Sequence, residues 1–300
     1  MISILIPIFN YNTIPLVEII HQQLELLNIN YEIICVCDAS TEFIKENKTI
    51  NTYSNTQLIS LNRNIGRSKI RNLLVEKSNY NWLLFLDADV LPQSKFFIKT
   101  YLNLIKKSNV KVLCGGLIYQ NIRPKKEQRL RWVYGRKREQ IFVEKRTEKP
   151  YQYVSGANVL IHKSLFETIK FNDSIVNYGY EDVLFVEDLK LKGITILHVQ
   201  NPVLHLGIEH SLVFLNKTKE GLKNLYNLNL NGILKGDNLK IIKVFRLLKS
   251  LKLIRSVSLF FKIFKRILEC NLLGKRPSLF LFDIYKIGYY CTVNVENKEK

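Results

Sequence analysis

Two carboxylates one residue apart, Asp87 and Asp89, directly follow a run of five large apolar residues at 82–86. A D-x-D pair of this kind can present oxygen atoms to a hard divalent cation, which in turn can hold a diphosphate. The apolar run is typical of a strand buried on both faces, and ligands of open α/β sheets bind outside the carboxyl ends of such strands. An isolated D-x-D is nevertheless more often a helix cap beside an exposed aspartate, so the rest of the chain must decide between the two interpretations.

A second acidic pair, Glu181 and Asp182, opens a segment at 183–191 whose apolar residues have helical spacing. Carboxylates at a helix N-terminus are favoured by the helix dipole, and this effect alone can account for both residues. The glycine-containing aromatic turn at 177–180 could instead direct one carboxylate into a cleft, where it would act as a general base. A lone histidine such as His205 is more typical of packing or surface than of a ligand, although imidazole suits Mn²⁺ beside a D-x-D pair.

The elements that must position these side chains alternate along the chain. The predicted strands are 2–10, 31–38, 58–61, 82–86, 110–114, 153–161, 194–199 and 202–206, and the predicted helices of the first half are 13–28, 67–77 and 94–107. This alternation predicts an α/β fold with a mainly parallel, doubly wound sheet and helices on both faces. Asn10, Asp38 and Asp87 end three of the strands, so we expect them along one edge of the sheet, in the layout of a nucleotide site.

The sequence lacks the glycine-rich loops that bind phosphate in many nucleotide-binding proteins. It has no G-x-G-x-x-G after the first strand and no Walker A lysine. The charge of a bound diphosphate would therefore have to be met by a metal ion and by basic side chains. Candidates for the basic side chains are Arg67, Arg71 and the segment 121–150, in which cations alternate with aromatic residues. That segment is equally well explained as a solvated basic helix.

The composition is that of a globular chain made for a reducing compartment. Of the 300 residues, 47% are hydrophobic and 24% are charged, which is enough for a sizeable core. Five cysteines without a C-x-x-C pair indicate reduced thiols, not disulfides or a zinc site. The N-terminus lacks the basic region and cleavage site of a signal peptide, and no apolar run approaches the ~20 residues that span a bilayer. We expect a cytoplasmic protein, and peripheral attachment to the inner face of the cytoplasmic membrane extends this prediction.

The net charge of +19 is concentrated in two segments. Residues 121–150 hold 11 basic and 4 acidic residues, and residues 239–300 hold 14 and 4, whereas residues 1–120 hold 12 and 9. A nucleic-acid or polyanion-binding protein, one alternative for this chain, would spread cations over the sheet face, so no nucleic acid partner is expected. A second alternative, a sugar nucleotidylyltransferase, requires a glycine-rich loop after the first strand, and residues 7–10 lack one.

Residues 239–269 have the pattern of basic amphipathic helices. Cations and apolar residues fall on opposite faces both before and after Ser250, but the two basic faces differ by about 120°, which predicts a bend or break near that residue. Such helices suit the surface of an anionic membrane, and residues 239–276 are predicted to contact one. Packing of the apolar face on the preceding α/β domain or on a second subunit is an equally good explanation.

Seven short stretches of this sequence resemble, in order, those of the family 2 glycosyltransferases, which are inverting enzymes of the GT-A fold. They are residues 6–10, 36–41, 64–72, 85–89, 155–158, 179–182 and His205. The later stretches are similar to the acceptor half of galactosyltransferases and N-acetylgalactosaminyltransferases. Cys37 and Ala39 depart from the family pattern, which leaves Asp38 to make the contact with the base alone.

The resemblance implies a role for each marked residue. The residues expected at the nucleotide sugar are Pro7, Phe9, Asp38, Gly66, Arg67, Arg71 and Asp87. The residues expected at a Mn²⁺ or Mg²⁺ cofactor are Asp89 and His205, with Asp87 acting through water or the ribose. Asp182 would be the catalytic base, and Glu181 remains the alternative because the residues alone do not distinguish the two. The residues expected to orient the acceptor are Asn158, Tyr180 and Glu181.

The resemblance also implies an organisation and an activity. A nucleotide-sugar-binding half is expected at 1–120, an acceptor and catalytic half of the same GT-A domain at 121–210, and a helical, basic C-terminal region at 211–300. The implied reaction is the metal-dependent, inverting transfer of a sugar, from a UDP-linked hexose or N-acetylhexosamine, to an acceptor hydroxyl. The implied partners are a nucleotide sugar and a glycan or lipid-linked glycan of bacterial surface polysaccharide synthesis.

Overall fold

The computed structural model describes residues 1–175, 179–234 and 239–298. The chain divides into two compact units, which are described separately. Unit 1 comprises Met1–Gln120, Glu139–Val176 and Glu181–Gly207, and unit 2 comprises Asn121–Arg138, Asn177–Tyr180 and Ile208–Lys300. Two residues of the predicted aromatic turn, Asn177 and Tyr178, lie outside the described residues.

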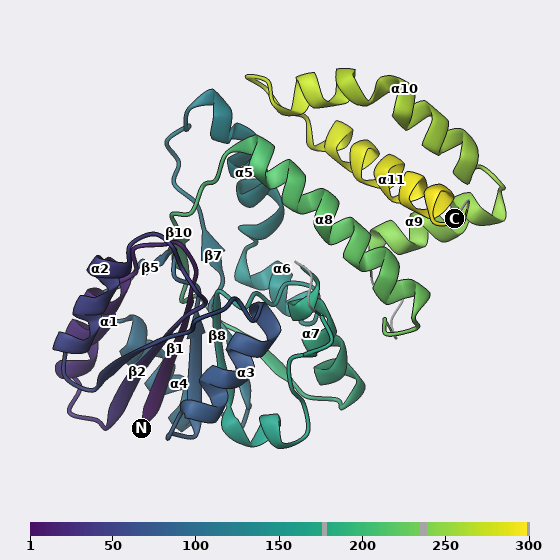
Figure 1. Cartoon of the computed structure of the whole chain (residues 1–300). Coiled ribbons are helices and arrows are strands. Elements are labelled where there is room, and N and C mark those ends of the chain that lie inside the picture. Colours follow the sequence, from purple (N-terminus) through teal and green to yellow (C-terminus); the bar gives the residue numbers. More distant parts are fainter. Residues whose placement is uncertain (176–178, 235–238, 299–300) are drawn as a thin grey trace. The chain divides into compact units, whose positions relative to one another are not determined.

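Unit 1 is built on a seven-stranded sheet with the order β3-β2-β1-β4-β8-β6-β9 (Figure 1). The strands are β1 (Ile2–Ile8), β2 (Tyr31–Cys37), β3 (Thr56–Ser60), β4 (Trp82–Leu86), β6 (Val112–Cys114), β8 (Asn158–His162) and β9 (Ile196–His198). Neighbouring strands are parallel except where β8 pairs antiparallel with β4 and β6. The predicted mainly parallel α/β sheet is therefore confirmed.

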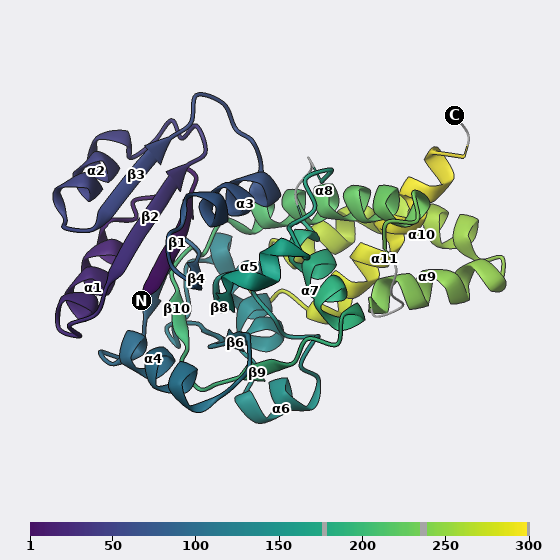
Figure 2. The ribbon, with the colours of Figure 1, turned by 90° about the horizontal axis from the view of Figure 1, so that it is seen from below.

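Helices cover both faces of this sheet (Figure 2). The helices of unit 1 are α1 (Ile14–Glu25), α2 (Ile44–Lys48), α3 (Arg67–Lys77), α4 (Phe97–Lys107), α6 (Val143–Glu148) and α7 (Glu181–Leu191), with short 3₁₀ helices at Thr49–Thr52 and Lys163–Glu167. Side chains of a strand alternate between the faces. Leu83 and Phe85 of β4 accordingly pack in one core cluster with side chains of α3 and α7, while Leu84 between them is equally buried. The central strands are thus buried on both faces, as their continuous apolar runs predict.

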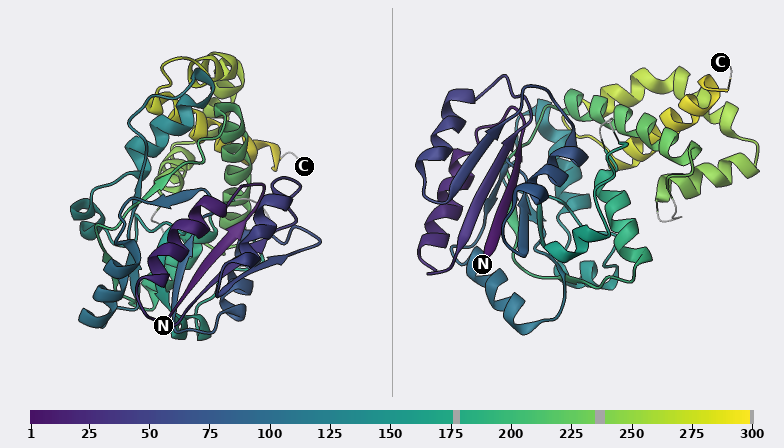
Figure 3. Two further views of the ribbon diagram at one scale, coloured as in Figure 1. Left: turned by 90° about the vertical axis from the view of Figure 1, so that its left-hand side faces the viewer. Right: turned by 60° about the horizontal axis from the view of Figure 1, so that its bottom comes forward.

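Unit 1 also contains a second sheet of three short strands, the first of which follows β4 directly. It consists of β5 (Val90–Pro92), β10 (Val203–His205) and β7 (Leu117–Ile118), with β10 in the middle. β5 pairs antiparallel with β10, and Val90 lies opposite His205. This pairing brings a histidine from far along the sequence next to the D-x-D turn that connects β4 to β5. Figure 3 shows the strands of unit 1 from two further sides.

Unit 2 is helical. Its helices are α5 (Arg129–Tyr134), α8 (Ser211–Leu230), α9 (Lys240–Ser250), α10 (Ile254–Leu272) and α11 (Leu279–Glu296), with a 3₁₀ turn at Lys126–Gln128 and a π-helical turn at Gly135–Glu139. Helix α11 lies between α8 and α10 (Figure 1), and its Tyr285 and Tyr290 are fully buried. The break predicted near Ser250 is confirmed, because α9 ends at that residue and Lys252 has a φ of 59°. In the described part of the chain, no helix combines the length and the apolar character that crossing a bilayer requires.

Candidate active site

The ends of β1 and β2 are tied together by Asn10 and Asp38. Asn10 Oδ1 accepts the N–H of Thr41 at 2.8 Å. Asp38 is buried, and its two carboxylate oxygens accept the N–H groups of Ile65 and Gly66 at 2.7 and 3.1 Å. These bonds fix the turn that begins α3. Each oxygen of Asp38 keeps a further lone pair, so the predicted contact with a base remains chemically open and stays a prediction.

Pro7 and Phe9, which are also predicted near the nucleotide, lie at the end of β1 beside Asp38. The ladder between β1 and β4 ends at Leu5, two residues before Pro7. Phe9 lies beyond the end of β1 and is 56% exposed, so a ligand at this edge can reach its ring. Ala39, which departs from the family pattern, has a φ of 56° in the left-handed region. A side chain there costs ~1–2 kcal/mol relative to the right-handed conformation, which explains why glycine suits this position.

The two aspartates of the D-x-D turn have different partners. Asp87 Oδ1 lies 3.2 Å from a guanidinium nitrogen of Arg71, and Asp87 Oδ2 lies 3.8 Å from one of Arg67. Asp89 Oδ2 lies instead 3.6 Å from His205 Nε2. The turn thus directs one carboxylate toward α3 and the other toward β10. The separate roles expected for the two residues, Asp89 at the metal and Asp87 near the ribose, stay predictions.

Arg71 links the D-x-D turn to the second acidic pair. Its side chain is 1% exposed, and its NH1 nitrogen lies 3.5 Å both from Glu181 Oε1 and from Asp182 Oδ1. Arg67 adds a 2.8 Å contact to Glu181 Oε1. Two arginines therefore meet three carboxylates, and Arg71 touches all three. Because a buried charge without a partner is costly, this arrangement keeps the two acidic segments together.

Asp182 and Glu181 differ in what can reach them. The side chain of Glu181 is 5% exposed and is held by both arginines, whereas that of Asp182 is 32% exposed. Asp182 Oδ2 accepts the N–H of Gly156 at 3.3 Å, and Oδ1 has no hydrogen bond within the described residues. Gly156 is required at this point, because a Cβ would lie 2.7 Å from Arg71. Oδ1 itself is buried, so the exposed part of this carboxylate lies on the side of Oδ2, and Asp182 is the more accessible of the two acidic residues.

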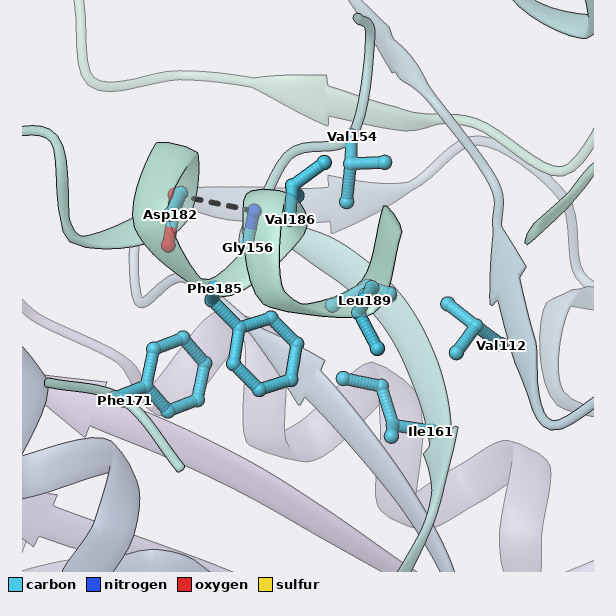
Figure 4. Close-up of a pocket in the computed structure, with 10 residues that line it drawn as sticks. Val112, Val154, Gly156, Ile161, Phe171, Asp182, Phe185, Val186 and Leu189 are labelled. Atoms are coloured by element: carbon cyan, nitrogen blue, oxygen red, sulfur yellow. Dashed lines mark hydrogen bonds between the residues drawn. The ribbon is translucent and has the colours of Figure 1, made fainter. Parts of the chain in front are cut away.

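Figure 4 shows the apolar pocket beside Asp182. Side chains from β6, β8 and α7 line it, including Val112, Ile161, Phe185 and Leu189. These groups shield one side of the carboxylate from water.

Asp89 and His205 have the chemistry of a partial cation site. Their facing atoms are 3.6 Å apart, and two ligand atoms that each lie ~2.1–2.2 Å from one ion can be separated by such a distance. His205 Nδ1 is buried without a hydrogen-bond partner in the described residues, so the ring is not committed to the protein's own hydrogen bonds. The described residues contain no group of three His, Cys, Asp or Glu side chains around one point. A Mg²⁺- or Mn²⁺-type ion fits here if a diphosphate and water complete its coordination, as is usual for Mg²⁺.

Three residues that support this pair were not predicted. The Tyr119 ring stacks on His205 with centroids 5.2 Å apart, and its hydroxyl donates to Glu139. A Cβ at Gly207 would lie 1.9 Å from Asp89 Oδ2. Burial raises the pKa of Tyr11, and the charge of Asp89 raises it further. None of these residues belongs to a periodic pattern or motif, so only the fold reveals them.

Two residues predicted at the acceptor have other surroundings. Asn158 is 1% exposed and donates to the carbonyls of Gly116 and Asn201, while its Oδ1 accepts from the Tyr101 hydroxyl. These bonds use both N–H groups of the Asn158 side-chain amide. The side chain therefore positions β8 and has no N–H left to donate to an acceptor substrate. Tyr180 belongs to unit 2, where it packs against a hydrophobic cluster and burial raises its pKa. Its predicted contact with the acceptor stays a prediction.

Arg146 corrects part of the expectation for residues 121–150. It is buried, and it donates to the carbonyls of Cys114 and Val199 and to His198 Nδ1 at 3.0, 2.9 and 3.1 Å. Burial lowers the pKa of this guanidinium. Arg146 therefore holds loops of unit 1 together and does not meet a phosphate. The segment 121–138, which contains most of the other cations, belongs to unit 2.

The family model described as glycosyl transferase family 2 matches residues 3–170, more than half of the chain. The chain belongs to glycosyltransferase family 2. The match includes the ends of β1 and β2, the start of α3 and the D-x-D turn. It argues against both alternatives, the nucleotidylyltransferase and the polyanion-binding protein. A comparison with curated protein sequences gives no significant match.

Three solved structures are similar to this chain to different degrees. The mannosyltransferase PcManGT from Pyrobaculum calidifontis, in complex with GDP-Man and Mn²⁺, has 11% identity and a TM-score of 0.53 over 77% of this chain, which spans 64% of that protein. TarS 1–349 of S. aureus in complex with UDP-GlcNAc has 15% identity and a TM-score of 0.48, with 99% and 91% of the two chains covered. Glucosyl-3-phosphoglycerate synthase from Mycobacterium tuberculosis has 12% identity and a TM-score of 0.49, with 76% and 79% covered. The first of these likenesses supports a GT-A-type fold for unit 1.

Proposed function

We propose that this protein is a metal-dependent, inverting glycosyltransferase that uses a nucleotide sugar as donor. The observation that carries the proposal is the arrangement around Arg71. In unit 1, this residue joins a reachable carboxylate, Asp182, to the turn that holds Asp89 opposite His205. This arrangement supports a general base and a cation site at one edge of the sheet, where α/β proteins bind nucleotides.

Asp182 is the proposed general base. Its carboxylate accepts the proton of the acceptor hydroxyl while that oxygen forms a bond to the anomeric carbon of the donor sugar. The bond between the anomeric carbon and the diphosphate oxygen breaks at the same time, and its electron pair leaves with the nucleoside diphosphate. Attack from the face opposite to the leaving group inverts the anomeric centre. Glu181, which is buried and paired with both arginines, positions Asp182 and Arg71.

The leaving diphosphate carries negative charge that must be stabilised. Asp89 and His205 are the residues that would hold Mn²⁺ or Mg²⁺, with Asp87 close to the ribose and acting indirectly. When bound, such an ion neutralises the charge that develops on the diphosphate. Arg67, which is 42% exposed and begins α3, can add a further positive charge at the same edge.

The finer assignments rest on the sequence resemblance. They are a UDP-linked hexose or N-acetylhexosamine as donor, a glycan or lipid-linked glycan as acceptor, and a role in bacterial surface polysaccharide synthesis. The same resemblance assigns Pro7, Phe9, Asp38, Gly66 and Arg71 to the nucleotide sugar, and an acceptor half like that of galactosyl- and N-acetylgalactosaminyltransferases. Work at the inner face of the cytoplasmic membrane, through residues 239–276, completes the proposal.

The test is release of UDP from a panel of UDP-sugars, with and without Mn²⁺. We expect release that requires the ion and that falls by ~10²–10⁴-fold in Asp182→Asn, the range over which general-base catalysis typically acts. Asp188→Asn is the matched control, because Asp188 lies on the same helix and outside the arginine network. Full activity in Asp182→Asn would exclude this residue as the base. No turnover of any nucleotide sugar would contradict the proposed function itself.

A further inference from the structure

One face of helix α10 packs against the rest of unit 2. Its side chains Phe261, Leu268 and Leu272 are buried in the same cluster as Tyr285 of α11. The packing is close, since a Cβ at Gly288 of α11 would lie 2.7 Å from the Phe261 ring. The inward face of α10 is therefore fixed by its contact with α11, and the direction of the opposite face is fixed with it.

The opposite face of α10 is apolar and exposed. We call it the outer face and define it as Leu259, Phe260, Ile263, Phe264 and Ile267. These side chains are 38–65% exposed, and at 100° per residue they cover an arc of about 140° away from the packed face. The rings of Phe260 and Phe264 touch, with centroids 4.5 Å apart. A soluble monomer rarely leaves a continuous apolar face of this kind uncovered.

This finding corrects the expected use of the apolar residues of the helix. The sequence pattern places them, with Leu259 as the exception, on one face opposite the cations, and the structure divides them between two uses. Phe261 and Leu268 pack on α11, whereas Ile263 and Ile267 point outward and are more than 60% exposed. The apolar residues of α10 cover a wider arc of the helix surface than the part that packs on α11. The surplus needs a separate explanation.

Charge identifies the kind of surface that would cover the outer face. Residues 239–268 contain nine lysines and arginines and no acidic residue. On α10, Arg255 and Arg266 flank the outer face on the side of Leu259, and both are exposed. Lys262, farther round the helix, pairs with Glu296 at 3.4 Å. Within the described residues, Arg255 and Arg266 have no acidic partner. An apolar face bordered by such cations complements a surface that is anionic at its boundary and apolar below it, as an acidic lipid bilayer is.

A second copy of the chain fits the same face less well. In a two-fold contact the same patch meets itself. The flanking arginines of one copy would then approach those of the other, without acidic residues of this segment to compensate. Like charges brought together at an interface oppose association.

We propose that the outer face of α10 docks on an anionic lipid membrane, with the helix lying in the plane of the surface. The preceding helix has exposed apolar residues of its own, such as Leu247 and Leu251, but the break after Ser250 separates them from the outer face. The docking itself needs no catalysis. Its purpose, to bring the site to a lipid-linked acceptor, rests on the proposed function.

The experiment is flotation of the full-length protein with lipid vesicles. One set contains phosphatidylglycerol and phosphatidylcholine in equal amounts, and the other contains phosphatidylcholine alone. We expect the protein to float with the anionic vesicles, and less so at ~0.5 M salt, where charges are screened beyond a few ångströms. The double variant Ile263→Ser/Ile267→Ser should lower the partition coefficient at least about tenfold, because two side chains lose most of their apolar surface.

Two further variants separate the contributions. Leu212→Ser/Leu230→Ser, at exposed leucines of α8, is the matched control and should leave flotation unchanged. Arg255→Gln/Arg266→Gln should lower binding to anionic vesicles by about tenfold or more, since each cation near such a surface contributes ~1 kcal/mol, or about fivefold. Melting temperatures of all variants verify that each one is folded.

Three outcomes would overturn the docking proposal. They are absence of flotation by the unmodified protein, equal flotation by the Ile263→Ser/Ile267→Ser variant, and a dimer in solution that this variant dissociates. UDP release with a soluble acceptor is measured on the same samples. Flotation without any UDP release contradicts the proposed transfer reaction alone, and UDP release without flotation contradicts the docking alone.

Discussion

Arg71 is the residue on which the site depends most. Its guanidinium is almost fully buried and lies within 3.5 Å of carboxylate oxygens of Asp87, Glu181 and Asp182. Removing one partner from a buried ion network leaves the others desolvated and unpaired. The same residue therefore contributes to stability and to the position of the base.

We predict that Arg71→Met lowers the free energy of unfolding by ~3–5 kcal/mol, because it removes a buried cation that contacts three carboxylates. Arg67→Met is the control, since Arg67 is 42% exposed and an exposed pair contributes less than ~1 kcal/mol. Urea unfolding followed by circular dichroism measures both values. Equal losses in the two variants would show that the burial of Arg71 does not matter.

At the scale of elements, the pairing of β5 with β10 brings together the two residues of the proposed cation site. The D-x-D turn ends in Asp89, and the next residue, Val90, pairs with His205. Gly207 follows β10 so closely that a side chain there would overlap the Asp89 carboxylate. The position of Asp89 thus depends on the absence of a Cβ on the neighbouring strand's continuation.

Gly207→Ala should displace Asp89 and raise the Mn²⁺ concentration needed for half-maximal UDP release by ~10–100-fold, the usual effect of disturbing a metal ligand's surroundings. A smaller thermal shift on addition of Mn²⁺ should accompany it. Gly193→Ala is the control, because its φ of 65° makes alanine strained there but no atom lies within 4 Å of the added Cβ. If both variants keep the normal Mn²⁺ requirement, Asp89 is not a ligand.

At the scale of the whole molecule, the pH dependence of the free energy of unfolding should depend on one buried histidine, His198. His198 Nε2 donates to the Pro150 carbonyl, and Nδ1 accepts from Arg146, so the ring is neutral in the folded state. Burial lowers the pKa of His198, Arg146 lowers it further, and the Pro150 bond opposes the shift. In the unfolded chain the pKa returns to ~6.5, so the unfolded state binds more protons below that pH.

The contribution of His198 is therefore complete above pH ~6.5 and is lost as the pH falls below this value toward the lower pKa of the folded state. We predict that the free energy of unfolding falls between pH ~7.5 and ~5.5, and that it falls less in His198→Gln. Urea unfolding at both pH values measures the difference. Burial and Lys111 also lower the pKa of His162, so part of the pH dependence should remain in the variant. An identical pH dependence in the two proteins would contradict the role of His198.

The amino-acid sequence determined the strands of the seven-stranded sheet, the helices α1, α3, α4 and α7, and their order, because continuous apolar runs and helical spacing report local burial. The short strands β5 and β7 were not predicted. It also determined the family, since short stretches with Asp38, Asp89 and Asp182 keep their order along the chain. The D-x-D turn could be predicted as a site because an apolar run followed by two carboxylates can be recognised in the sequence itself. The break between α9 and α10 was predictable for a similar reason, because the basic faces of the two segments point in directions about 120° apart around the helix axis.

Only the tertiary structure decided which of these side chains meet. Arg71 and Asp182 are far apart in sequence, and their contact depends on how α3 and α7 pack on one sheet. The tertiary structure also distinguished Asp182 from Glu181, because the Asp182 side chain is the more exposed of the two. It showed as well that the Asn158 side chain is used to support β8. The outer face of α10 was undecided for the same reason. A periodic pattern shows that a helix has an apolar arc, but the amount of that arc that stays uncovered depends on the neighbour that packs against it.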